Sequence, residues 1–358
     1  MIVLKKIILM LLGIILLTGC STKTDNLKSF KDANSKHETY ELKGNMKIIS
    51  NEDEFTYKIT VGVKDNELFK VSLTNTINDH EQIILRNEEG VYVVTPSLNK
   101  SFKFMSEWPN NSSQAYLIGN LVSDVSKNSK ANIESINNGY QITTTVNYPN
   151  NPKLVKESIK TDKDFNLKSV DIMDEENNVL MNVEFKDINY KPNFSRDYFD
   201  LSVTDKSEKS EEEEKKVEDC KDTCKEDEEC KNSCTTKSTS NILEDIIYPL
   251  YVPVDTYLSS KDTIETKDGN RVILTFAGVD PFILVEEVAN FSDEMEVIPV
   301  SGEPLQVGSS IGALSDNSIY FTSNGVDYYL TSNTLKSSEM QLIAESITNG
   351  TNLVAGVK

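Results

Sequence analysis

Apolar and polar residues alternate along most of residues 40–204, and a period of two is typical of antiparallel strands that bury one face. Tyr57, Ile59, Val61 and Val63 fall on one such face. Clusters of Asn, Asp, Glu and Gly separate the runs and predict turns. The predicted strands are residues 57–63, 69–73, 82–87, 90–96, 101–105, 140–146, 167–173 and 179–190.

One segment of this region has helical spacing instead. It begins with Ser112 and Ser113, which we expect to cap the helix, and it places Tyr116, Leu121 and Val125 on one side. Strands combined with one or two amphipathic helices predict an α+β fold, in which a curved sheet wraps over a helix and has a concave apolar face.

A second β-rich region follows at residues 241–350. It opens with a possible helix at 242–250, and hairpin turns are predicted at Asp268–Gly269 and, most strongly, at Asn324–Gly325. A closing helix is predicted from its helical spacing of Met340, Ile343 and Ile347, with Ser338 as its cap.

The chain begins with an export signal. Lys5 and Lys6 precede an apolar run that is too short to span a bilayer, and the stretch LLTGC ends at Cys20. This stretch resembles a bacterial lipobox, which implies that Cys20 becomes the lipidated N-terminus and carries acyl chains such as palmitate. Residues 20–39 read as a polar stalk without an apolar period.

The net charge of −20 indicates that the chain avoids nucleic acid and anionic lipid headgroups. Much of the acidic excess lies in residues 205–240, a charged linker with too few apolar residues to order itself.

Four further cysteines lie within this linker, at positions 220, 224, 230 and 234. An exported chain allows disulfides to persist, and two bridges that fold the segment back on itself are our preferred interpretation. Of the three possible connectivities we favour Cys220 with Cys234 and Cys224 with Cys230. A four-thiolate zinc site is the alternative, although the spacing is unusual for one; reduced thiols are the third possibility.

The sequence gives little support for catalysis, and we predict neither a catalytic residue nor a cofactor. The two histidines are His37, in the polar stalk, and His80, in a predicted hairpin turn. Glu286 and Glu287 are predicted to be solvated positions of a strand or helix.

Two blocks carry a resemblance to a known family: QIILRNEEGVYVVTPSLNKSFKFMSEWPNNSSQAYLIGNLVSDV, residues 82–125, and VLMNVEFKDINYKPNFSRDYF, residues 179–199. They resemble the LolA-like domain of lipoproteins from spore-forming Gram-positive bacteria, the carrier-type proteins that include the YdcC and GerS sporulation and germination lipoproteins. The later region resembles the smaller second domain of longer members, and the two-domain plan is similar to that of RseB-type regulators.

The resemblance implies a half-open antiparallel β-barrel covered by helices, followed by a smaller α+β domain. Such a barrel has an apolar cavity, although inward-facing apolar residues are more often plain core. The candidates for the cavity or a partner surface are Val71, Leu73, Val93, Phe102, Phe104, Trp108, Tyr116 and Leu121.

These observations predict a signal peptide (1–19), a stalk (20–39), a LolA-like domain (40–204), a linker (205–240) and a C-terminal domain (241–350). The expected function is that of a non-enzymatic, extracytoplasmic lipoprotein anchored in the cell membrane. It would bind an envelope protein, such as a cell-wall hydrolase or a regulator, in connection with sporulation or germination. The alternative is a binder of lipid or lipoprotein acyl chains.

Overall fold

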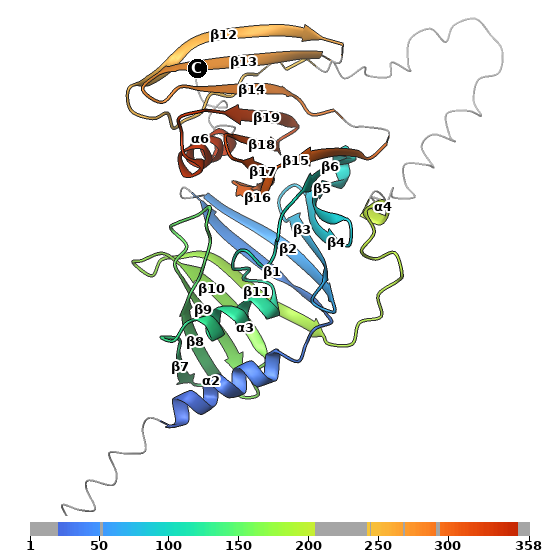
Figure 1. Cartoon of the computed structure of the whole chain (residues 1–358), viewed down its shortest axis with the longest axis vertical. Helices are drawn as coiled ribbons and strands as arrows, with labels where there is room; N and C mark the ends of the chain where they lie inside the picture. Colours follow the sequence, from blue (N-terminus) through green and yellow to red (C-terminus); the bar gives the residue numbers. More distant parts are fainter. Residues whose placement is uncertain are drawn as a thin grey trace, which may run out of the picture. The chain divides into compact units, whose positions relative to one another are not determined.

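The computed structural model describes residues 21–204 and 242–349, apart from 51–52, 244, 268 and 291–293. It consists mostly of β-strands with few helices and divides into two compact units (Figure 1). Unit 1 contains residues up to His80 together with 86–89 and 107–194. Unit 2 combines residues 81–85 and 90–106, which fall within the predicted first domain, with the described residues from Ser195 onward.

Unit 1 is built on antiparallel strands in the order β3-β2-β1-β11-β10-β9-β8-β7. The strands are β1 (Tyr40–Ser50), β2 (Asp53–Lys64), β3 (Leu68–Asn75), β7 (Asn132–Ile136), β8 (Gly139–Thr145), β9 (Lys156–Asp162), β10 (Leu167–Met173) and β11 (Val179–Asn189). The alternation that predicted strands at 57–63 and 69–73 is confirmed by β2 and β3. The described part of the unit also contains two helices: α2 (Ser21–Asn34) contacts β7 and α3 (Ile118–Lys127), and α3 also contacts β8.

The predicted capping of α3 by Ser112 and Ser113 is wrong. The helix begins later, at Ile118, whose backbone N–H donates to the hydroxyl of buried Tyr40 at 3.0 Å. Ser113 is occupied elsewhere, because its N–H donates to the carbonyl of Asn147 and its hydroxyl accepts from the N–H of Asn147. A tertiary contact therefore replaces the local cap.

Unit 2 contains a seven-stranded antiparallel sheet in the order β12-β13-β14-β19-β18-β17-β16. Its strands are β12 (Thr256–Thr266), β13 (Gly269–Gly278), β14 (Phe282–Val288), β16 (Gly302–Val307), β17 (Ser310–Ser315), β18 (Ser318–Ser323) and β19 (Val326–Thr331). The Asn324–Gly325 turn is confirmed: both residues have positive φ, 51° and 78°, as a two-residue hairpin loop requires. Strands β12 and β13 form the other predicted hairpin, which closes between Thr266 and Gly269.

One face of this sheet, which we call its inner face, carries the core of unit 2. Helix α6 (Ser337–Asn349) contacts β16, β18 and β19, and it buries Met340, Ile343 and Ile347 as predicted. Because α6 begins at Ser337, Ser338 lies inside the helix and is not its cap.

The helix predicted at 242–250 is wrong, because the described residues of this segment are not helical. Their backbone groups bond to the sheet instead. The N–H and C=O of Leu243 pair with the side-chain amide of Asn270, at 2.6 and 3.3 Å, and Leu243 packs into the core. Tertiary hydrogen bonds have thus replaced those that a helix would make within itself.

Glu286 lies in the same core, which overturns its predicted exposure. It follows Phe282 and Leu284 on the inner face of β14 and is fully buried. One carboxyl oxygen accepts the N–H of Ile247 at 3.0 Å. Burial raises the pKa of Glu286 to about 7, although the Ile247 hydrogen bond works in the opposite direction. Its neighbour Glu287 points the other way and pairs with Arg271.

The opposite face of the sheet, its outer face, is partly covered by residues from early in the chain. These residues form β4 (Glu81–Asn87), β5 (Gly90–Thr95), a 3-10 turn (Pro96–Leu98) and β6 (Lys100–Phe104). Strand β15 (Glu296–Val300) pairs with β6 in parallel. A short helix, α4 (Leu201–Thr204), lies just before the predicted linker. The side-chain amide of Gln82 makes two hydrogen bonds with the backbone of Ile311, at 3.0 and 2.6 Å.

A buried ion pair completes this cover. Lys100 Nζ lies 2.5 Å from Asp327 Oδ2, and the two side chains are only 7% and 6% exposed. Thr322 donates to the other carboxylate oxygen of Asp327 at 2.5 Å, and Lys100 also donates to the hydroxyl of Tyr320 at 3.3 Å. Phe102 packs edge-to-face on the Tyr320 ring at 4.9 Å.

We expect Lys100→Met to lower the free energy of unfolding by about 3–5 kcal/mol, because it leaves the buried carboxylate of Asp327 without its cation. Arg271→Met is the matched control. It removes a cation from an ion pair that is 46% and 34% exposed, so it should cost no more than about 1 kcal/mol. Urea unfolding followed by circular dichroism measures both. Equal losses in the two variants would contradict this prediction.

The raised pKa of Glu286 predicts a pH dependence of stability. A carboxyl group whose pKa rises on folding binds an extra proton in the folded state, so stability should fall as the pH increases from the ordinary value of 4.5 to about 7. Glu286→Gln stays neutral and keeps an acceptor for Ile247. Its melting temperature should therefore drop less than that of the native chain between about pH 5 and about pH 8. Glu287→Gln, which changes a half-exposed carboxylate on the opposite face of the same strand, should leave the pH profile nearly unchanged. The same profile in all three proteins would refute the assignment.

Candidate functional site

All eight residues proposed to line a cavity or partner surface are buried, with none more than 7% exposed. They are divided between the two units: Val71, Leu73, Trp108, Tyr116 and Leu121 belong to unit 1, and Val93, Phe102 and Phe104 to unit 2. Val93 and Phe102 are directly opposite each other on β5 and β6. Their side chains contribute to packed cores in both units.

Trp108, the single tryptophan, belongs to the interior of unit 1. Its ring meets that of Phe69 edge-to-face, with 6.0 Å between the centroids. The guanidinium of Arg86 donates to the carbonyl of Trp108 and to that of Glu107. Phe69 on β3 and the segment that follows β6 are thereby held together.

A cluster of polar side chains lies between α3 and strands β8 and β9 of unit 1. Glu157 on β9 faces inward, opposite Thr144 on β8, and is 1% exposed. Thr144 donates to the backbone carbonyl of Asp124 on α3 at 3.4 Å. Among the described residues, neither carboxyl oxygen of Glu157 has a hydrogen-bond partner. None of these residues was among the candidates predicted from the sequence.

Burial raises the pKa values of the acidic groups in this cluster. Burial raises the pKa of Glu157 well above its ordinary range, and the charge of Asp124 raises it further. Burial also raises the pKa of Asp124 and of Tyr148, and the latter is raised again by Glu157. A neutral Glu157 is a hydrogen-bond donor as well as an acceptor, so the cluster could bind a polar group that enters beneath α3.

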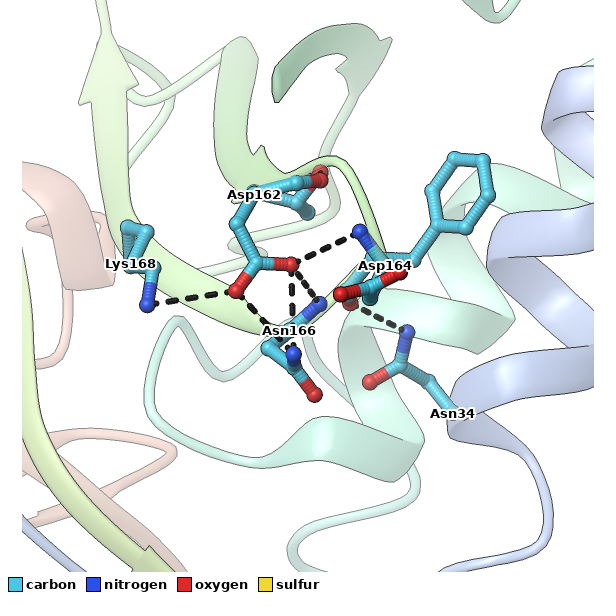
Figure 2. Close-up of polar contacts among 7 residues, drawn as sticks. Asn34, Asp162, Asp164, Asn166 and Lys168 are labelled. Carbon is cyan, nitrogen blue, oxygen red and sulfur yellow. Dashed lines mark hydrogen bonds and ion pairs between the residues drawn. The ribbon is translucent and has the colours of Figure 1, made fainter. Parts of the chain in front are cut away.

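A second polar network fixes α2 to the β9–β10 turn of unit 1 (Figure 2). Asp162 begins the β9–β10 turn and accepts hydrogen bonds from the backbone N–H groups of Asp164 and Asn166, at 3.0 and 2.9 Å. Its other oxygen lies 3.3 Å from Lys168 Nζ. Although burial alone would raise the pKa of Asp162, hydrogen bonds from Asn166, Asp164 and Lys168 lower it overall.

The turn presents one carbonyl to α2. Phe165 has a left-handed backbone, φ 64°, and stacks on Tyr140 at 4.7 Å. Its carbonyl accepts the side-chain N–H of buried Asn34 at 3.2 Å, which Figure 2 shows at the end of α2. Phe30, one turn earlier, is fully buried. The segment expected to be a polar stalk is therefore largely a docked helix.

His37 follows α2 and stacks on Tyr190 with 3.6 Å between the ring centroids. Burial, with a smaller contribution from Lys36, lowers its pKa. His80 lies in the predicted hairpin turn, where its carbonyl accepts the N–H of Asn75 at 2.9 Å. The structure thus places the two histidines in separate parts of unit 1.

Several sequence predictions fall outside the described residues: the export signal, Cys20 and the four linker cysteines. Within the described part of the chain, no helix combines the length and hydrophobicity needed to cross a bilayer.

The fold is that of a protein of two antiparallel β-sheet units in which helices are few. No protein-family profile matches the chain. "Sporulation protein YdcC" of Bacillus subtilis (strain 168) is 34% identical over 340 residues, which cover 94% of each chain. This chain belongs to the YdcC family of sporulation proteins, and the predicted relation is confirmed.

Solved structures give distant matches. One is a chain of the Pseudomonas aeruginosa MucA/MucB complex, which is 10% identical, covers 90% of this chain and 96% of that one, and has a TM-score of 0.30. Another is a chain of the Clostridioides difficile CwlD amidase in complex with the GerS lipoprotein, at 15% identity, 47% and 95% coverage and a TM-score of 0.30. The family assignment rests on the sequence relative.

We expect Phe30→Ala to release α2 from unit 1. The substitution removes the fully buried ring of the helix, a change that typically costs about 3–5 kcal/mol, and an isolated helix of this length is marginal in water. Amide hydrogen exchange of residues 25–34 should become fast while the sheet stays protected. Ser29→Ala changes an exposed residue of the same helix and serves as the control. Unchanged exchange in the Phe30 variant would show that the ring does not hold the helix.

Proposed function

We propose that this chain is an extracytoplasmic lipoprotein that is held at the cell membrane by acyl chains on Cys20 and binds an envelope protein during sporulation or germination. Membership of the YdcC family carries the proposal, since the relative spans nearly the whole chain and is named as a sporulation protein. The protein acts by binding and not by catalysis.

The arrangement at the N-terminus supports the anchoring part. Helix α2 begins at Ser21, directly after the proposed lipidated residue, and is docked through Phe30 and Asn34. A short docked helix would hold unit 1 close to the bilayer, whereas a long flexible stalk would let its distance from the bilayer vary. A partner bound by such a protein is itself accessible from the membrane surface.

We also propose the detailed domain organisation. The sheet of unit 1 would form the half-open barrel of LolA-like proteins, and residues 205–240 would join residues 40–204 to a C-terminal domain at 241–350. The four cysteines would close two bridges, Cys220 with Cys234 and Cys224 with Cys230, in an exported linker.

Binding of acyl chains is the second candidate, and the polar cluster beneath α3 favours it. A neutral Glu157 without a protein partner would suit the amide or ester of an acylated ligand whose chain enters the apolar interior. Against it, the side chains proposed to line a cavity are packed in cores, which favours binding of a protein at the surface.

The experiment compares the native chain with Cys20→Ser in sporulating cells, using crosslinking followed by fractionation. The native chain should stay with salt-washed membranes and yield a stoichiometric adduct with one extracytoplasmic protein, while the Cys20 variant should be released. A variant that remains on the membrane would refute the lipid anchor. If no adduct forms and native mass spectrometry shows an acylated peptide bound at roughly tens of micromolar, acyl binding would replace partner binding as the function. Such binding is measurable because each buried methylene contributes about 0.8 kcal/mol.

A further inference from the structure

The described residues cover the outer face of the seven-stranded sheet over only part of its width. At β17–β19 the cover includes Gln82 on Ile311 and Lys100 on Asp327. At the other edge, β12 is exposed or half-exposed along its whole length. The same sheet face therefore passes from a covered to an uncovered region within unit 2.

Apolar side chains gather at one end of the uncovered region. The register pairs Leu258 with Phe276 and Phe276 with Phe282, and the stacked rings of the two phenylalanines lie on the inner face. Because neighbouring residues of a strand point to opposite faces, Tyr257 and Ile283 lie on the outer face. Val254 and Val279 are in the loops at the same strand ends. Their exposures are 84% for Val254, 63% for Tyr257, 67% for Val279 and 38% for Ile283. We call these four residues the β12–β14 surface.

Hydrogen bonds fix the two loops to each other. The N–H of Val279 donates to the carbonyl of Asp255 at 3.2 Å, and the N–H of Asp280 donates to the hydroxyl of Thr256 at 3.3 Å. Gly278 has φ +134°, and a side chain there would collide with the carbonyl of Asp255. A rigid apolar surface loses little conformational entropy when it is covered, which is a property of binding sites.

The charges around this surface select what could cover it. Asp255 and Asp280 lie in the two loops, and residues 251–260 and 272–287 contain no lysine or arginine. A second copy of this chain, with a net charge of −20, would bring acidic loops against acidic loops. Anionic lipid headgroups would be repelled in the same way.

The covered half of the outer face shows which chemistry fits such a sheet. There an aromatic ring, Phe102, packs on Tyr320 while the ammonium group of Lys100 neutralises Asp327. We propose that the β12–β14 surface is the docking site for a partner protein that presents apolar side chains bordered by lysine or arginine. This inference rests on the proposed partner-binding function and names its site.

The test places the photocrosslinking residue p-benzoylphenylalanine at position 257, and separately at 279, in the full-length lipoprotein in sporulating cells. Ile77 of unit 1 is 80% exposed and provides the control position. We expect an adduct from 257 and 279 with one other protein, whose crosslinked peptide contains lysine or arginine among apolar residues. In purified form, Asp255→Lys with Asp280→Lys should weaken binding of that protein about tenfold or more.

Glu175→Lys with Glu176→Lys makes the same charge change in an exposed turn of unit 1 and should leave binding unchanged. An adduct with twice the mass of the chain, or a lipid adduct, would overturn the proposal. A protein captured from position 77 but not from 257 or 279 would reject this site and keep the partner-binding function. No protein captured from any of the three positions would reject both. Circular dichroism of each variant confirms that the fold is retained.

Discussion

The buried ion pair between Lys100 and Asp327 is the interaction on which the organisation of unit 2 depends. It joins a strand from early in the chain to a sheet formed more than two hundred residues later, and both side chains are largely buried. Desolvating two charges is costly, so the pair is stable only with both partners and their hydrogen bonds in place. Tyr320, Thr322 and the parallel pairing of β15 with β6 supply that environment. The arrangement specifies how β4–β6 meet the sheet.

Buried carboxyl groups recur in both units. Glu286 lies in the core of the seven-stranded sheet and Glu157 beneath α3, and burial raises the pKa of each. The fold therefore favours the neutral form of these groups, since a carboxylate without a cation is poorly solvated in a protein interior. Glu286 has a structural role, because it accepts the N–H of Ile247 and so holds the segment that precedes the sheet. Neither carboxyl oxygen of Glu157 has a hydrogen-bond partner among the described residues.

The proposed anchor and the proposed docking surface belong to separate parts of the chain. Helix α2 follows the proposed lipidated residue and is fixed to unit 1 by Phe30 and by Asn34 on the β9–β10 turn. The β12–β14 surface belongs to unit 2 and is formed by Tyr257 and Ile283 on two strands and by two loops that are hydrogen-bonded to each other.

The sequence alone determined the features that depend on neighbouring residues. Alternation along β2 and β3, the helical spacing of α6 and the Asn324–Gly325 turn are local, because they follow from side-chain period and backbone sterics. The inward position of Glu286 could have been read from its parity with Phe282 and Leu284, yet its charge argued for exposure. Only tertiary structure decided that residues 242–250 bond to the sheet and that a polar segment docks as a helix. It also decided that β6 pairs with β15, since contacts between distant segments leave no periodic trace in either one.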